Sequence, residues 1–71
     1  MPEFQISILA ARTNAKLTQQ EMADKLGINR TSYLKYENGE VSMRMDTAVH
    51  FSEIVNIPMQ YIDFSLSKNT A

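Results

Sequence analysis

The chain has 71 residues, enough for one small domain near the lower size limit for a self-sufficient hydrophobic core. It has no cysteine and one histidine, so disulfide bonds are excluded and no metal site or cofactor is expected. No apolar run approaches the roughly 18 residues of a membrane span, and no signal peptide is recognisable, so we expect a cytoplasmic location and no membrane partner.

The net charge of −1 gives no global indication of nucleic-acid binding, but the charges are unevenly distributed. Residues 12–44 carry six basic and four acidic side chains, a balance of +2, whereas residues 45–71 carry one basic and three acidic side chains, a balance of −2. This asymmetry is weakly in favour of a DNA contact through one side of the domain.

Residues 3 to about 13 are predicted to form the first helix. Pro2 is compatible with its start, and Phe4, Ile8 and Leu9 place apolar side chains along adjacent faces. No pattern in the chain calls for a strand.

A second, short helix is predicted to begin at Thr18 and to end at Gly27. Thr18 and Glu21 form a capping box, in which each side chain satisfies a backbone N–H at the start of the helix. Met22, Ala23 and Leu26 then give it one apolar stripe. Glycine suits the end of the helix, because the residue after a helix usually needs a positive φ angle.

The third helix is predicted over about 29–37, directly after this turn. Asn29 is a good N-cap, and Asn38-Gly39 closes the helix with residues suited to the left-handed conformation. At 100° per residue the two tyrosines fall on one side and the other side carries Arg30, Thr31, Leu34 and Lys35. Two short helices joined by a tight turn indicate a helix-turn-helix, whose outward side chains can reach a major groove.

The remaining chain is predicted to hold a loop at residues 40–43, a fourth helix at 44–55 and a short fifth helix beginning at Pro58. Asn56 is expected to end the fourth helix in the left-handed conformation. The inward side chains of the fourth helix are expected to be Met45, Ala48, Phe51, Ser52 and Val55. The predicted fold is therefore all-α, a compact five-helix domain over residues 1–64 with a polar, flexible tail over residues 65–71.

Several separate stretches resemble the helix-turn-helix signature of the phage repressor and Cro family, the xenobiotic response element type. The resemblance covers roughly residues 6–62. It is carried by Leu17-Thr18-Gln19, Glu21-Met22-Ala23, Leu26-Gly27-Ile28 and Tyr36-Glu37-Asn38-Gly39, together with Arg12, Thr47, Phe51 and Val55. It implies a repressor-like fold and a sequence-specific regulator of transcription that inserts the third helix in the major groove of double-stranded DNA.

The resemblance also implies roles for single residues. It places Arg30, Thr31 and Lys35 at bases, and it places Gln19, Asn29, Asn38 and Arg44 at phosphates. For Asn38 a role as a helix cap alone is equally open. Two positions depart from the family, with Tyr33 in place of a branched aliphatic residue and Met43 in place of proline. The loop at 40–43 also lacks the cations common there, which lowers the affinity expected from charge neutralisation.

Arg12 and Glu37 resemble an ion pair that ties the first helix to the end of the third, and for these two a structural role is expected. The resemblance further implies a homodimer, formed alone or on DNA, through a surface near the end of the domain. There we expect Met59, Tyr61 and Phe64 at the interface, although Ile57, Ile62 and Phe64 could instead close the core.

Two other functions compete with DNA binding. The same fold could be a protein-interaction module, such as an antitoxin or scaffold subunit, which the low net charge and an outward Leu34 favour. An enzyme is not expected, because the chain has one histidine, no cysteine and no evident pair of carboxylates in a cleft.

Overall fold

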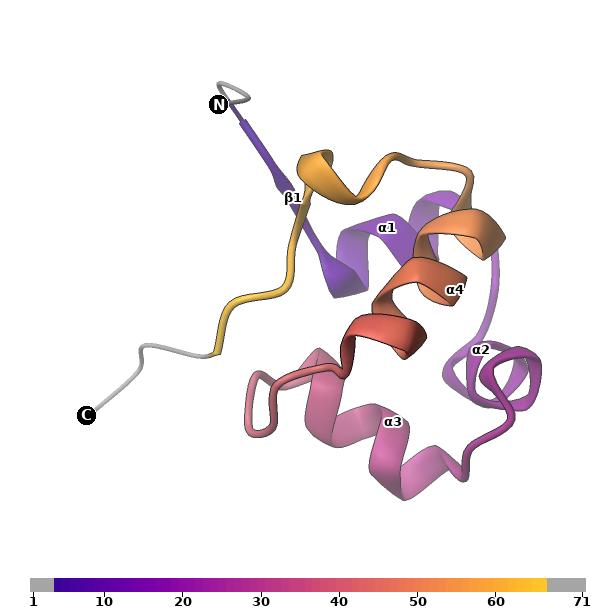
Figure 1. The fold of residues 1–71 in the computed structure, drawn as a ribbon. Coiled ribbons are helices and arrows are strands. Elements are labelled where there is room, and N and C mark those ends of the chain that lie inside the picture. The colour runs from indigo at the N-terminus through magenta and orange to yellow at the C-terminus, as the bar shows by residue number, and fades with distance from the viewer. Residues whose placement is uncertain (1–3, 67–71) are drawn as a thin grey trace.

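The structure is a computed structural model that describes residues 4–66. Four α-helices, one 3₁₀ helix and two short strands make up this part of the chain (Figure 1). In chain order they are β1 (Ile6–Ser7), α1 (Ile8–Asn14), α2 (Gln19–Leu26), α3 (Arg30–Glu37), α4 (Met45–Val55), η1 (Met59–Tyr61) and β2 (Ile62–Asp63).

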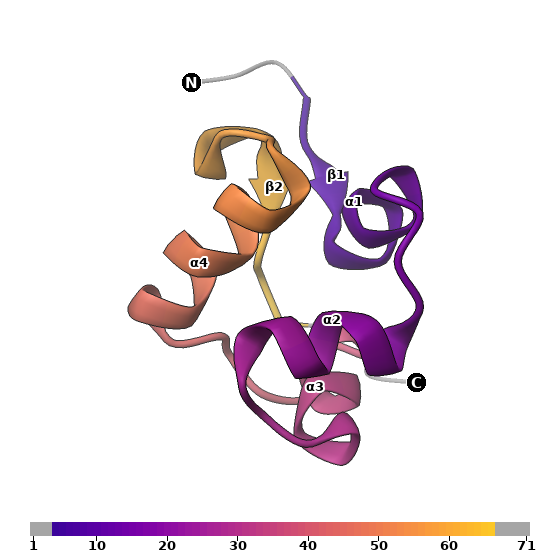
Figure 2. The same ribbon diagram turned by 90° about the vertical axis from the view of Figure 1, so that its right-hand side faces the viewer.

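The molecule has a strand end and a helix-turn-helix end. Figure 2 shows β1 and β2 side by side at one end, α2 and α3 at the opposite end, and α1 and α4 between them. The two strands are parallel, with Ile6 opposite Ile62 and Ser7 opposite Asp63. The expectation of a chain without strands is therefore wrong.

The first helix starts five residues later than predicted. Ser7 is its N-cap, with an extended backbone and a side-chain oxygen that accepts a hydrogen bond from the Ala10 N–H at 2.9 Å. This cap makes Ile8 the first residue of the helix and leaves Ile6 in an extended segment that pairs with Ile62. Pro2, expected at the helix start, lies outside the described residues. Phe4 is 65% exposed and is no part of a helix face.

The predicted fifth helix is only a single 3₁₀ turn. Pro58 precedes it, and the backbone becomes extended at Ile62, which enters β2. The mainly helical fold is thus confirmed, but with four α-helices rather than five. The predicted polar tail reaches the structure only through Ser65 and Leu66, since residues 67–71 lie outside the described part.

The core forms where the helices and β2 meet. Its buried side chains come from α1, α2, α3, α4 and β2, and they are Ile8, Ala11, Met22, Ala23, Tyr33, Phe51, Val55 and Ile62. Ala48 is also buried, so three of the inward positions expected on α4 are confirmed. Met45 is 71% exposed, because it is the first residue of α4 and that turn extends beyond the core.

The predicted helix ends are confirmed with one change. Thr18 and Glu21 form both hydrogen bonds of the capping box, and Gly27 and Asn56 have φ angles of 73° and 58°. At the end of α3 the left-handed residue is Gly39 alone, since Asn38 keeps a right-handed helical conformation.

Candidate nucleic-acid interface

The turn between α2 and α3 is set by three consecutive residues. Gly27 ends α2 with its N–H directed to the carbonyls of Ala23 and Asp24. Ile28 is half-buried against the core, and the Asn29 side chain accepts a hydrogen bond from the Ser32 N–H at 2.7 Å. This arrangement holds α3 against α2 at a fixed angle, with one side of α3 turned away from the domain (Figure 2).

The faces of α3 follow the predicted division. Tyr33 is completely buried and Tyr36 is half-buried against the core. Arg30, Thr31 and Lys35 are exposed. Leu34, expected to be exposed, is half-buried without belonging to the core cluster.

The polar residues expected at phosphates all make hydrogen bonds within the domain. The Asn38 amide donates to Glu40 at 3.3 Å, and Asn29 caps α3. Arg44 lies 3.4 Å from the Asp46 carboxylate, and both side chains are more than 70% exposed. Their roles toward a ligand stay predictions, because these contacts by themselves serve only the fold.

Gln19, the first residue of α2, contacts residues at both ends of α3. Its side-chain nitrogen donates to the Glu37 carboxylate at 3.1 Å, and its side-chain oxygen accepts from the Arg30 guanidinium, also at 3.1 Å. The structure thus brings together two residues that sequence reasoning treated separately, Gln19 and Arg30.

Glu37 and Arg12 form an ion pair, as the sequence indicated. The Arg12 Nε donates to the Glu37 Oε2 at 2.7 Å, and a second guanidinium nitrogen reaches Oε1 at 3.3 Å. The remaining terminal nitrogen of Arg12 donates to the Leu17 carbonyl at 2.7 Å. Only 12% of the Arg12 side chain and 5% of the Glu37 side chain are exposed. The pair therefore joins α1 to α3 in a nearly dry environment.

The Tyr33 hydroxyl is a further donor to this carboxylate, at 2.6 Å from Oε2, and sequence reasoning missed it. The available signal was a tyrosine expected in the core, since a buried tyrosine hydroxyl needs a hydrogen-bond partner. Tyr33 and Glu37 are also four residues apart, which places both on one face of the helix.

These contacts shift the pKa values of all three residues. Burial alone would raise the pKa of Glu37, but hydrogen bonds from Arg12, Tyr33 and Gln19 together hold it below its ordinary value. The hydrogen bond to Glu37 raises the pKa of Arg12 despite its burial. Burial, and then the hydrogen bond to Glu37, raise the pKa of Tyr33. Glu37 is therefore a carboxylate and Tyr33 a neutral donor at neutral pH.

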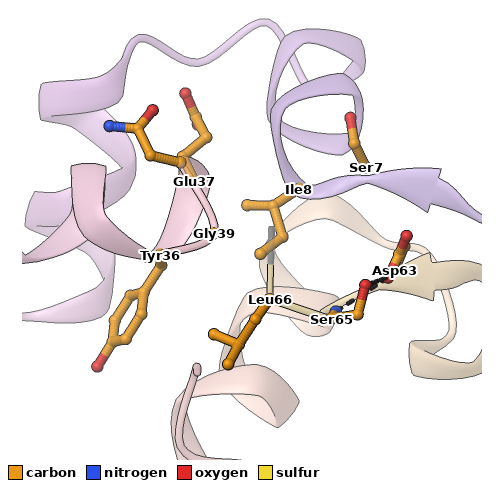
Figure 3. Close-up of a pocket in the computed structure, with 9 residues that line it drawn as sticks. Ser7, Ile8, Tyr36, Glu37, Gly39, Asp63, Ser65 and Leu66 are labelled. Carbon is orange, nitrogen blue, oxygen red and sulfur yellow. Dashed lines mark hydrogen bonds between the residues drawn. The ribbon is translucent and has the colours of Figure 1, made fainter. Parts of the chain in front are cut away.

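A shallow hollow lies between the end of α3 and the two strands (Figure 3). Ile8 and Leu66 both line it, and the Glu37 side chain points away from Leu66. Its polar rim includes Ser7 and Asp63. Glu37 also lines this hollow, but its carboxylate is hydrogen-bonded to Arg12, Gln19 and Tyr33.

The arrangement defines a helix-turn-helix domain whose outer helix presents two exposed cations and a hydroxyl. In the described residues no cluster of three metal-binding side chains occurs, and no helix is long and apolar enough to cross a membrane.

The chain belongs to the Helix-turn-helix family, whose model matches residues 8–62. It is 39% identical over 59 residues to the uncharacterized HTH-type transcriptional regulator YqaE of Bacillus subtilis, covering 83% of this chain and 51% of that protein. It is 45% identical over 40 residues to the cryptic phage CTXphi transcriptional repressor RstR of Vibrio cholerae, covering 56% of this chain and 36% of that protein.

A third relative is the SPbeta prophage-derived uncharacterized HTH-type transcriptional regulator YonR of Bacillus subtilis. It is 37% identical over 51 residues, covering 72% of this chain and 47% of that protein. The chain thus spans about half the length, or less, of the curated relatives it matches. No solved structure gives a significant match.

Proposed function

We propose that this domain binds double-stranded DNA in a sequence-specific manner and regulates transcription in the cytoplasm. The observation that carries the proposal is the outer face of α3, where Arg30, Thr31 and Lys35 are exposed while Tyr33 anchors the opposite face in the core. Transcriptional regulators and a phage repressor among the relatives support it.

In this proposal α3 lies in the major groove. Arg30 and Lys35 donate hydrogen bonds to acceptors on bases, most favourably guanine, and Thr31 contacts a neighbouring base edge. Gln19, Asn29, Asn38 and Arg44 contact phosphates, which fixes the register of the helix on the duplex. Asn29 and Asn38 lie at the two ends of α3, Gln19 at the start of α2 and Arg44 at the start of α4. In this proposal the domain binds DNA and has no catalytic role.

The test is selection of bound duplexes from a random pool, followed by affinity measurements on the selected site. Arg30→Ala and Lys35→Ala should each weaken binding roughly 5- to 150-fold, since a good base contact is worth about 1–3 kcal/mol. Lys25→Ala, which removes an equal charge from the last turn of α2, is the matched control. A pool without enrichment at low salt would refute the proposal and favour a protein-interaction module.

We propose in addition that the domain binds as a homodimer on DNA. The exposed cations near α3 are few, so one domain neutralises few phosphates. Two linked domains would double these contacts, with half-sites about one helical turn apart. A two-fold symmetric pair also matches the commonest form of soluble oligomer.

The structure bears differently on the three interface candidates. Phe64 packs edge to face on Phe51, with ring centres 6.0 Å apart, which favours a place in the domain's own core over one at the interface. Tyr61 is 37% exposed and borders an apolar hollow with Phe4, Ile6 and Ile57. Met59, half-buried in η1, stays a candidate beside it.

Sedimentation of the free protein and of its DNA complex tests the dimer. We expect two protomers on a selected site that has two-fold symmetry. Tyr61→Ser should reduce the share of the two-protomer complex, whereas Val49→Ser, which removes an exposed apolar side chain from α4, should not. One protomer on an asymmetric site would overturn the dimer while leaving DNA binding intact.

A further inference from the structure

Lys16, in the turn between α1 and α2, has a backbone conformation that L-amino acids rarely adopt. Its φ angle is 63°, in the left-handed region. Among residues 4–66 the other residues with positive φ are Gly27, Gly39 and Asn56, and glycine and asparagine enter this region most readily. In lysine the Cβ atom comes too close to the following carbonyl oxygen, which destabilises the conformation. The turn therefore contains a strained residue.

The fold requires the left-handed conformation at this position but not the lysine side chain. The Lys16 N–H donates to the Thr13 carbonyl at 2.9 Å, and the Leu17 N–H donates to the Arg12 carbonyl at 3.3 Å. These two hydrogen bonds close the end of α1 in a common way, with a left-handed residue at a position that most often holds glycine. Glycine would form the same hydrogen bonds without the strain.

The Lys16 side chain contributes no polar contact to the fold. It is exposed, and within residues 4–66 it forms neither a hydrogen bond nor an ion pair. Two other exposed cations near α3 are engaged, since Arg30 donates to Gln19 and Arg44 lies beside Asp46. Lys16 therefore keeps a positive charge at the surface that no described carboxylate neutralises.

The turn holds Lys16 close to the end of α3. The carbonyl of its neighbour Leu17 accepts a hydrogen bond from the Arg12 guanidinium at 2.7 Å, and the same guanidinium is bound to Glu37, the last residue of α3. In Figure 2 the segment between α1 and α2 runs to the helix-turn-helix end of the domain. Lys16 thus lies next to the helix proposed to enter the major groove, on a different element from it.

We infer that Lys16 is a phosphate-binding residue of the proposed DNA interface, kept at a strained position because its charge contributes to binding. The inference rests on the proposed function. Gln19 and Asn38, proposed to contact phosphates from the start of α2 and the end of α3, are neutral, and Lys16 would add a cation beside them. An ammonium on a flexible stem suits a phosphate as a point charge. Strained backbone conformations cluster at functional sites, where the strain serves the function.

The charge of Lys16 should act on every duplex alike, because phosphates carry no sequence information. Each phosphate that a protein neutralises adds about 0.9 to the steepness with which log K falls against log salt. Referred to 1 M salt, the loss of one such contact should weaken binding about 15-fold at 0.05 M salt and about 4-fold at 0.2 M salt for each bound domain.

Lys16→Gly and Lys16→Asn test the inference, with thermal unfolding and salt-dependent DNA binding measured on the same proteins. Both variants remove the charge and suit the left-handed conformation. Lys16→Gly should raise the melting temperature by about 2–8 °C, because relief of the strain exceeds the freedom that glycine adds to the unfolded chain. Both variants should bind the selected duplex and a mismatched duplex more weakly by the same factor, with a salt slope shallower by about 0.9 per domain.

Lys16→Arg and Lys25→Ala are the matched controls. Lys16→Arg keeps both the charge and the strain, so its melting temperature and salt slope should stay those of wild type. Lys25→Ala removes an equal charge from the last turn of α2 and should leave the salt slope unchanged. A slope that falls equally in Lys25→Ala and Lys16→Gly would show an effect of net charge alone and would overturn the inference.

Three further outcomes would also contradict the role of Lys16. Unchanged affinity and salt slope in Lys16→Gly, with specific binding by the wild type, would overturn the inference and leave the proposed function standing. A loss confined to the selected duplex would mean that Lys16 reads a base instead of a phosphate. A melting temperature of Lys16→Gly no higher than that of wild type would show that the lysine is not strained. Failure of the duplex selection with the wild-type protein, in contrast, would refute the proposed function and this inference together.

Discussion

Replacing Glu37 by alanine removes the acceptor on which α1, α2 and α3 converge. Arg12 would keep one hydrogen bond, to the Leu17 carbonyl, but its charge would stay buried without a partner. The Tyr33 hydroxyl would lose its acceptor as well. Breaking a buried ion pair by removing one partner costs about 3–5 kcal/mol.

This loss is large for so small a domain. At about 0.05–0.15 kcal/mol per residue, a chain of 71 residues is stable by roughly 4–11 kcal/mol. A change of 3 kcal/mol should lower the melting temperature by at least about 12 °C, since each kcal/mol shifts a domain of this size by about 4–8 °C. We therefore expect Glu37→Ala to be partly unfolded near its working temperature.

Urea unfolding at low temperature, followed by far-ultraviolet circular dichroism, measures the effect. Glu40→Ala is the control, because Glu40 is exposed and its carboxylate only accepts a long hydrogen bond from Asn38. Its free energy of unfolding should stay within about 0.5 kcal/mol of wild type. Equal unfolding midpoints for the two variants would show that the Arg12–Glu37 pair does not stabilise the fold.

Three smaller predictions concern Glu37, its partner Tyr33 and the turn at Gly27. The folded-state pKa of Glu37 lies below the ordinary 4.5, so the stability that the ionised Glu37 contributes is complete above pH 4.5 and is lost as the pH falls through the lowered pKa. Glu37→Gln should therefore flatten the pH dependence of the free energy of unfolding in this acidic range. An unchanged slope would contradict this. Tyr33→Phe should lower the free energy of unfolding by about 0.5–1.5 kcal/mol, because Arg12 still donates to the same Glu37 oxygen. It should also raise the pKa of Glu37 in an NMR titration. A loss of stability as large as that of Glu37→Ala would show that the Tyr33 hydroxyl dominates the network. Gly27→Ala should lower the free energy of unfolding by about 1–2 kcal/mol from its φ of +73° alone, since apart from Gly27 and its chain neighbours no described atom lies within 4 Å of the added Cβ. Gly27→Asn should lower it less, and thermal unfolding measures both.

The features predicted correctly from the sequence are mostly local. The capping box at Thr18, the turn at Gly27, the N-cap at Asn29 and the left-handed Asn56 each depend on backbone groups within a few residues. Short-range hydrogen bonds and allowed φ angles decide such positions almost alone. For this reason the two motif helices are found at nearly their observed bounds.

The errors have non-local causes. The pairing of β1 with β2 joins Ile6 to Ile62 through two residues on each side, which is too short for an alternating pattern to be visible. The sequence leaves Phe64 open between the core and an interface, and its packing on Phe51 is likewise a contact between separate elements. Met45 has the correct helix face but lies beyond the end of the core. The helical periodicity predicts on which face of a helix a residue lies, but not whether that part of the helix is covered by the core.

The sequence predicts which side chains of α3 are exposed, but not the hydrogen bonds that join them to other helices. The outward positions of α3 follow from 100° steps once Tyr33 is placed inside. The contact from Gln19 to Arg30 crosses from one helix to another, and its direction depends on an ion pair with Arg12 on a third. Only the packed structure brings these groups within hydrogen-bond distance.

The two faces of α3 separate stability from recognition, with one exception. Tyr33 and Glu37 fix the inner face, while Thr31 and Lys35 are exposed and contribute nothing to the core. If the domain binds DNA as proposed, different side chains at these two outer positions would change the preferred DNA site at little cost in the free energy of folding. Arg30 is the exception, because Gln19 connects it to the buried carboxylate. A replacement at Arg30 would remove the hydrogen bond that the Gln19 oxygen accepts, so the side chains at these two positions are coupled.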